Sequence, residues 1–162
     1  MTSPDPALPA FDWIEGGGVT TPLGFVAGGA YAGIKTYGAE PRLDLGLLAV
    51  EGDAGVAAGV FTQNAVTGHS VTHDRRVLGA RSDVRAIICN SGNANTVTGT
   101  QGAADCERMA SLAATRFGVT SDQVLVGSTG VIGRMLPMPK LEAALATVEV
   151  SRDGGYAFSR AI

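Results

Sequence analysis

The stretch with the clearest potential for chemistry is a Gly-Ser-Thr-Gly turn expected at residues 127–130. Three apolar residues at 124–126, two of them β-branched, precede it and predict a short buried strand. The glycines permit positive φ and let a substrate or another chain approach the backbone closely. A strand end that presents a hydroxyl and a backbone N–H in fixed positions suits the stabilisation of an oxyanion. The alternative is an ordinary strand end with a Ser/Thr turn.

The residues offer this turn no evident catalytic partner. No Ser/His/Asp or Cys/His set stands out, and the only histidines are His69 and His73. Four residues apart, they share one face of a strand or a helix. The glutamate of an H-E-x-x-H motif and a third ligand are both missing, which favours a surface role over a metal site. The residues alone therefore indicate the binding half of an active site.

Apolar runs elsewhere predict the strands that position this turn. Two of them, at 43–51 and 55–62, are joined by a Gly/Asp turn typical of a hairpin. Both runs are apolar on each face, so both faces must be covered, which favours a layered α/β arrangement. Further strands are predicted at 13–25, broken by its glycines, and at 83–90, which leads toward the Asn-rich segment 90–95.

Helical periodicity predicts three helices. The clearest spans 103–117, with an apolar stripe on one face and Gly118 as its C-cap. Pro137 and Pro139 start a second helix, and a weaker third is predicted over 151–162. The fold class predicted from these elements is α/β.

Two polar features remain between the predicted elements. Three asparagines within residues 90–95 suit Asx turns and left-handed backbone, so a structural loop is the default, and support of an active site by these amides is the alternative. Lys35 ends a glycine-rich block that matches no phosphate-binding loop pattern. We expect a solvated strand-end lysine there, with a functional cation as the alternative.

Composition and charge argue against several classes of protein. A net charge of −3 gives no basic footprint for nucleic acid or a membrane surface, and no apolar run approaches the ~20 residues that span a bilayer. Residues 1–13 lack the basic and apolar regions of a secretion signal and predict a flexible leader. Cys89 and Cys106 are isolated and predict reduced thiols in a cytoplasmic protein.

Five sequence blocks occur in an order that resembles one known family. The blocks are GVTTPLGF at 18–25, GIK at 33–35, GVFTQN at 59–64, NSGNAN at 90–95 and STGVIG at 128–133. Over residues 14–162 the chain resembles the amino-terminal part of the ornithine acetyltransferase (glutamate N-acetyltransferase) family of arginine biosynthesis, covering less than half of a complete member.

The resemblance implies a fold and a mechanism. The fold would be a layered α/β/β/α sandwich-like architecture with mixed sheets, of which this chain is an incomplete amino-terminal portion. Members of the family cut themselves before a threonine, whose new terminal amine serves as its general base. The acetyl group passes from N2-acetylornithine to that threonine and then to glutamate in a ping-pong reaction. Thr129 and Gly130 match the family's oxyanion-hole pair.

The resemblance also implies what lies outside this chain. We expect residues 14–162 to be a truncated α-chain that stops before the self-cleavage site, with the nucleophile and substrate-binding residues beyond Ile162. Such a chain would be inactive alone and would need the β-chain of the same precursor, in an α2β2 heterotetramer. No cofactor or metal is expected, although some members also use acetyl-CoA as a co-substrate.

Two other functions stay open at this point. An N-terminal-nucleophile aminopeptidase could share the architecture and also cut itself, and a non-enzymatic module could hold a small anion or an amino acid in its Asn- and Gly-rich loops. The ordered blocks favour the acetyltransferase.

Overall fold

The computed structural model describes residues 12, 14–36, 40–52 and 55–162. The flexible leader predicted at 1–13 therefore lies almost entirely outside the described residues. Part of the hairpin turn predicted at 51–53 lies outside them as well.

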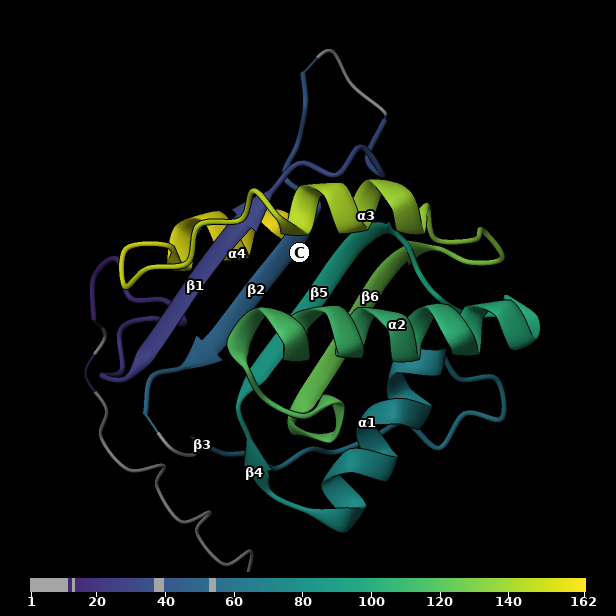
Figure 1. Ribbon diagram of the computed structural model, residues 1–162, viewed down its shortest axis with the longest axis horizontal. Coiled ribbons are helices and arrows are strands. Elements are labelled where there is room, and N and C mark those ends of the chain that lie inside the picture. The colour runs from purple at the N-terminus through teal and green to yellow at the C-terminus, as the bar shows by residue number, and fades with distance from the viewer. Residues whose placement is uncertain (1–11, 13, 37–39, 53–54) are drawn as a thin grey trace, which may run out of the picture.

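A four-stranded mixed sheet forms the centre of the chain (Figure 1). Its order is β1-β2-β5-β6, in which β1 and β5 run antiparallel to β2, and β6 runs parallel to β5. The strands are β1 (Phe25–Ala30), β2 (Leu45–Val50), β5 (Ala86–Asn93) and β6 (Val124–Val131). The predicted α/β class with a mixed sheet is confirmed.

Two of the strand predictions are wrong. The run at 55–62 forms only the two-residue strand β3 (Gly55–Val56), which pairs with β4 (Asp83–Val84) and makes no hairpin with β2. Both edges of β2 are already paired, with β1 and with β5, so β3 has no place beside it. The strand expected at 13–25 is also wrong, because turns occupy the described residues before β1.

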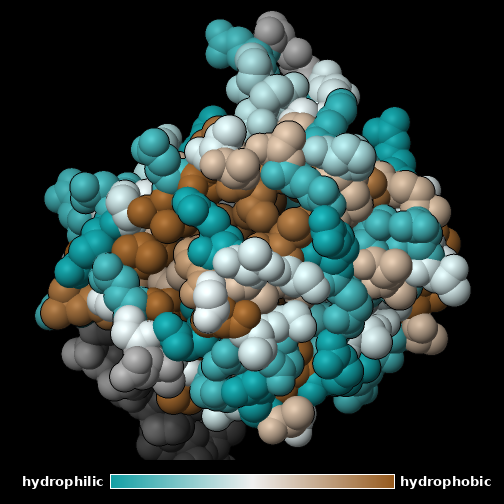
Figure 2. All heavy atoms as spheres, in the orientation of Figure 1, coloured by the Kyte–Doolittle hydropathy of each residue, from teal (hydrophilic) through white to brown (hydrophobic). Residues whose placement is uncertain are grey.

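Two helices cover one face of the sheet, in front of the strands in Figure 1. They are α2 (Gly99–Phe117) and α3 (Met138–Leu145), which lie over the apolar residues that alternate along β2, β5 and β6. Figure 2 shows hydrophobic atoms on this side over β1 and β2, where the helices leave the sheet less covered. The helix predicted at 103–117 is confirmed, beginning four residues earlier, and Gly118 caps it with φ 64°.

A third helix, α4 (Gly155–Ala161), packs closely on the opposite face. A Cβ atom on Gly29 would lie 2.6 Å from the Ala157 carbonyl oxygen, and one on Gly46 would lie 3.0 Å from the Phe158 ring. These two glycines are paired in register, so together they form the bare patch on which α4 sits. Beyond α4 this face is only half-buried, at positions that include Leu48, Ile87 and Leu125.

Helix α1 (His69–Ala80) covers part of the outer edge of β6. The Val126 N–H donates to Asp74 Oδ1 at 2.8 Å, and His73 Nε2 donates to the Val124 carbonyl at 3.0 Å. Two side chains thus take the place of a neighbouring strand. The surface role expected for the histidines is wrong for His73, which is 3% exposed, because its ring completes this edge.

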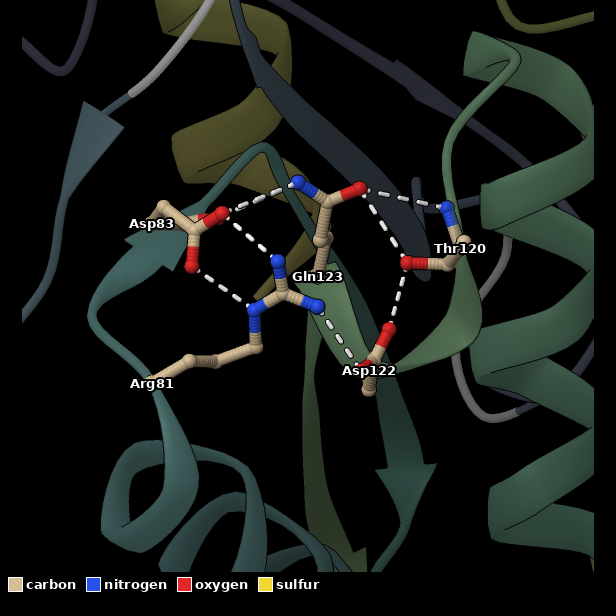
Figure 3. A network of polar contacts seen from close by, with 5 residues as sticks. All are labelled: Arg81, Asp83, Thr120, Asp122 and Gln123. Atoms are coloured by element: carbon tan, nitrogen blue, oxygen red, sulfur yellow. Dashed lines mark hydrogen bonds and ion pairs between the residues drawn. The ribbon is translucent and has the colours of Figure 1, made fainter.

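An exposed ion-pair network holds the turn that leads into β6 (Figure 3). Arg81 donates to both carboxylate oxygens of Asp83, at 2.7 and 2.6 Å, and to Asp122 at 2.7 Å. The hydrogen bonds from Arg81 lower the pKa of Asp83 to about 2. Thr120 and Gln123 form a capping box around the short helix η1 (Ser121–Gln123). The end of α1 is thereby tied to the start of β6.

The close packing of α4 on Gly29 predicts a stability difference between two glycine substitutions. Gly29→Ala should lower the free energy of unfolding by about 1–3 kcal/mol, because the new methyl group would meet a backbone oxygen. Gly79→Ala is the matched control, since a Cβ there meets nothing within 4 Å; it should raise stability by about 0.5–1 kcal/mol. Urea denaturation of the two variants measures both changes. Equal effects would contradict the close packing.

The β6 edge predicts a pH dependence of stability. Burial raises the pKa of Asp74 to about 6, against 3.8 for an unperturbed aspartate. The folded chain therefore holds this proton more tightly than the unfolded chain, so the contribution of Asp74 to stability falls as pH rises from about 4 to about 6.

Asp74→Asn keeps an acceptor for the Val126 N–H and removes the titration. The difference in unfolding free energy between wild type and this variant should change across pH 4–6 and level off above it, as measured by urea denaturation. A constant difference across that range would contradict the raised pKa.

Candidate active site

The expected turn at 127–130 is wrong in form, because β6 continues through these residues to Val131. Thr129 pairs in register with Ser91, and Gly130 with Gly92. The turn comes later, at residues 132–133. Pairing with β5 through Val131 holds this part of the chain in place.

At Gly92 and Gly130 the two parallel strands approach closely. Both residues have positive φ, 104° and 127°. A Cβ on Gly130 would lie 2.3 Å from the Gly92 carbonyl carbon and 2.8 Å from the Asn93 nitrogen. No side chain fits in that space, so glycine is required on steric and conformational grounds.

The hydroxyls of Ser128 and Thr129 lie on opposite faces of β6. The Asn95 N–H donates to Ser128 Oγ at 2.9 Å, and this hydroxyl donates to the Asn93 carbonyl at 3.1 Å. Ser128 is therefore engaged within the fold. Thr129 follows it in the strand, so it points to the opposite face, where it is exposed.

Strand alternation also gives the direction of the Gly130 amide. The Val126 N–H points outward to Asp74, away from β5. Residues two and four further along a strand share that orientation, which directs the Gly130 N–H to the same outer edge. An exposed hydroxyl and an edge amide thus come from consecutive residues, and their role as an oxyanion hole stays a prediction.

The Asn-rich segment braces this strand end. The expected loop at 90–95 is wrong over its first four residues, which belong to β5. Asn93 Nδ2 donates to the Met135 carbonyl at 3.0 Å, and the Ala94 N–H donates to the Val131 carbonyl at 2.9 Å. The alternative, in which this segment supports the candidate site, agrees with these contacts.

Asp44 is a site-organising residue that the sequence reasoning missed. Its carboxylate is fully buried and accepts three backbone N–H groups, from Ala32 at 2.5 Å, Ile34 at 2.6 Å and Lys35 at 2.9 Å. A charged residue inside an apolar run was the available signal, because a buried carboxylate must find donors. The three bonds fix the loop at 31–35.

That loop lies against the strand end. A Cβ on Gly92 would lie 2.8 Å from Ile34 Cγ2 and 3.2 Å from Lys35 Cγ. Lys35 therefore packs on the glycine that underlies Gly130. It is half-buried in a loop, with its Nζ donating to the Leu43 carbonyl at 3.2 Å, so the prediction of a solvated strand-end lysine is wrong.

A hollow of about 1000 Å³ opens beside this loop. Its lining includes three cations, Lys35, Arg42 and Arg160, and one carboxylate, Glu40. Burial and the two neighbouring guanidinium groups lower the pKa of Lys35, against the opposing effect of Asp44. The hollow is thus lined by charged groups of both signs.

The other candidate groups take no part in this site. Burial raises the pKa of Cys89 to about 11 and that of Cys106 to about 12, so both stay protonated thiols at neutral pH. Within the described residues, no three His, Cys, Asp or Glu side chains gather as metal ligands. Among the described helices, none combines the length and apolar character needed to cross a membrane.

Comparison with known protein families shows to which family this chain belongs. Residues 26–162 match the family model described as the ArgJ family. This chain belongs to the ArgJ family. The resemblance found in the sequence is thereby confirmed.

Curated relatives bear the name arginine biosynthesis bifunctional protein ArgJ. Those from a Synechococcus species and from Gloeobacter violaceus are each 44% identical to this chain, over 93% and 90% of its length. The matches cover only 36% and 35% of those relatives. This ArgJ chain therefore spans a little over one third of the length of the proteins it resembles.

Two solved structures share the fold. An ArgJ protein from Bacillus halodurans superposes with a TM-score of 0.84 at 33% identity, covering 92% of this chain and 76% of that one. The ornithine acetyltransferase from Mycobacterium tuberculosis, solved with ornithine bound, gives a TM-score of 0.79 at 44% identity, covering 90% and 78%. The mixed α/β arrangement described above is thus that of ArgJ proteins.

The Gly92–Gly130 contact predicts an unequal response to two substitutions. Gly133→Ala adds a Cβ at φ 77° with nothing within 4 Å, so it should cost about 1–2 kcal/mol of backbone strain alone. Gly130→Ala adds strain and also forces β5 and β6 apart, so it should cost about 1–3 kcal/mol more. Urea denaturation measures both, and equal losses would show that the strands do not need this approach.

Proposed function

We propose that this chain is the acyl-oxygen-binding part of an acetyltransferase that moves the acetyl group from N2-acetylornithine to glutamate. Membership of the ArgJ family supports the reaction, as does the solved ornithine acetyltransferase with its bound ornithine. The observation that carries the proposal is the end of β6, where Thr129 is exposed and adjacent to the edge amide of Gly130. Family membership also favours the transferase over the aminopeptidase and the binding module.

In the proposed reaction, a threonine from protein outside these 162 residues attacks the acetyl carbonyl. The carbonyl oxygen gains negative charge, which the Thr129 hydroxyl and the Gly130 N–H stabilise by hydrogen bonds. The threonine's own terminal amine takes the hydroxyl proton and returns a proton to the departing ornithine amine. Attack by the glutamate amine on the acetyl-threonine then repeats the same charge development and releases N-acetylglutamate.

The fixed geometry supports this role in physical terms. Donors aimed at a developing charge accelerate a reaction most when they need not reorganise. Pairing of β6 with β5 and the Gly92–Gly130 contact hold both donors in place before any substrate arrives. Interactions that strengthen only as charge develops lower the barrier and leave ground-state binding little changed.

The proposal also assigns the oxyanion donors and the nucleophile to different chains. Among the described residues the thiols of Cys89 and Cys106 stay protonated at neutral pH, and His73 is occupied at the edge of β6, so we assign the nucleophile to a partner chain of the same precursor. Residues 14–162 would then be the amino-terminal part of the acetyltransferase domain and inactive alone. An α2β2 assembly in the cytoplasm, with acetyl-CoA as a further acetyl donor, belongs to the same proposal.

A substitution at Thr129 tests the proposal in the complete acetyltransferase. Thr129→Val removes one donor at nearly constant volume, so kcat should fall about 100-fold or more with KM little changed. Acetyl transfer from N-acetylornithine to glutamate measures both constants. Thr129→Ser keeps the hydroxyl and is the matched control, expected to retain most of the rate. If Thr129→Val transfers acetyl at the wild-type rate, the oxyanion role is wrong.

A further inference from the structure

We propose that Asn95 is a positioning residue for acetyl transfer, which keeps Thr129 and Gly130 aligned through its hydrogen bond to Ser128. This inference rests on the proposed function and adds to it the residue that holds the two oxyanion donors in place. It starts from the contacts that Asn95 makes with β6, α1 and α2.

The side chain of Asn95 is held in one orientation by the start of α2. It is 2% exposed, its Nδ2 donates to the Gly102 carbonyl at 2.7 Å, and its Oδ1 accepts the Thr98 hydroxyl at 2.6 Å. A flipped amide would place its oxygen against the Gly102 carbonyl oxygen, so the donors and acceptors allow only this arrangement. Asn95 is thereby fixed relative to α2.

Thr98 makes this contact in place of a helix cap. It is the N-cap residue of α2, where a threonine hydroxyl ordinarily accepts an N–H group of the first helical turn. Among the described residues its side chain makes no such capping bond, and its hydroxyl donates to Asn95 instead. The helix therefore lacks a local stabilisation that the Asn95 amide receives.

The backbone of Asn95 connects this fixed amide to two other elements. Its N–H donates to Ser128 Oγ at 2.9 Å, and its carbonyl accepts the N–H of His69, the first residue of α1, at 2.9 Å. Ser128 donates in turn to the Asn93 carbonyl at 3.1 Å and directly precedes Thr129 in β6. A displacement of Asn95 would therefore move the residue next to the oxyanion donors.

Close packing around Asn95 opposes such a displacement. A Cβ on Gly102 would lie 2.5 Å from Asn95 Oδ1, and a Cβ on Gly68 would lie 2.8 Å from Thr96 Oγ1. The starts of α1 and α2 thus pack directly on the segment that contains Asn95. Because close-packed groups transmit a shift to their neighbours, both helices contribute to the position of the end of β6.

The directions of the side chains predict an effect on kcat alone. Ser128 and Thr129 point to opposite faces of β6, and Asn95 is buried, so neither Asn95 nor Ser128 would touch a substrate held at Thr129. Their contribution would be to keep the hydroxyl and the amide aimed at the charge that develops in the transition state.

Steady-state kinetics of the complete acetyltransferase test the inference with Asn95→Ala and Ser128→Ala. Each variant should lower kcat about 10-fold, with KM for N-acetylornithine and for glutamate within about twofold, because the donors lose alignment and substrate contacts remain. Val148→Ala is the control for a general loss of stability, since Val148 is a core side chain with 1% exposure outside these contacts. It should lower Tm and leave kcat within about twofold of wild type.

The double variant Asn95→Ala/Ser128→Ala shows whether Asn95 acts through Ser128. Its kcat should be no lower than that of the weaker single variant, because both changes break the same connection. A loss equal to the product of the two single losses would overturn the inference, since the residues would then act independently. The same conclusion follows if the folded single variants keep kcat within about twofold of wild type or change only KM.

Thr98 provides a milder test, which decides if Asn95→Ala or Ser128→Ala does not fold. Thr98→Val removes the hydroxyl that Asn95 accepts at nearly constant volume, so kcat should fall about 5-fold with KM little changed. Thr98→Ser keeps the hydroxyl and should transfer acetyl at the wild-type rate. Equal kcat values for Thr98→Val and wild type would overturn the inference.

Two further outcomes separate this inference from the proposed function. If Thr129→Val loses kcat while Asn95→Ala and Thr98→Val keep it, Asn95 is not a positioning residue and the acetyl transfer stands. If the wild-type protein transfers no acetyl group, the proposed function is wrong, and crystal structures of the complete protein decide the positioning. A shift of Thr129 relative to β5 by more than about 0.5 Å in Thr98→Val, absent from Val148→Ala, supports it. An unchanged position overturns it.

Discussion

The buried carboxylate of Asp44 is the interaction on which the candidate site depends. An ionised group inside a protein is stable only when its oxygens are satisfied, and here three backbone N–H groups satisfy them. Those amides come from one short loop, so a single side chain gives the loop its shape. The Asp44 backbone adds a further tie, because its carbonyl accepts the Ser91 N–H at 2.9 Å. One residue therefore connects the Lys35 loop to the strand that pairs with Thr129.

The outer edge of β6 is covered along one half and open along the other. His73 and Asp74 on α1 bind the backbone groups of Val124 and Val126, where a neighbouring strand would otherwise lie. An uncovered strand edge invites non-native pairing, so covering it with side chains protects the fold. Beyond the helix the same edge continues past Gly130. The candidate oxyanion donors therefore lie at exposed residues beyond α1, on a strand whose earlier part is bound by α1.

Local patterns predicted those elements whose structure is local. The helix at α2, its Gly118 cap and the apolar strand ahead of Thr129 all follow from periodicity and from glycine conformation over a few residues. The pairing of β3 with β4 could not be predicted from the hairpin pattern, because the paired strands of the main sheet decide which edges of β2 are free. The burial of His73 likewise depends on a carbonyl 51 residues away.

The candidate site likewise combines features that local sequence predicts with features that depend on contacts between distant residues. A glycine-flanked hydroxyl at 127–130 drew attention from composition alone, yet the reason for Gly130 is a contact with Gly92, 38 positions earlier and visible only once β5 and β6 are paired. Asp44 could have been singled out as a lone charge in an apolar run. The three cations of the hollow come from a loop, the approach to β2 and α4, and no spacing in the sequence brings them together.

Close contacts at three glycines set distances across this part of the molecule. Gly29 and Gly46 let α4 pack directly on the sheet, and Gly92 lets the Lys35 loop pack directly on β5. A Cβ on Gly29 would meet the Ala157 carbonyl oxygen, a backbone atom that cannot move aside by changing a rotamer. A Cβ on Gly92 would lie 2.8 Å from Ile34 Cγ2 and 3.2 Å from the Lys35 backbone nitrogen. A side chain at either position would therefore push α4 or the loop away from the sheet, so the spacing of these elements depends on glycine.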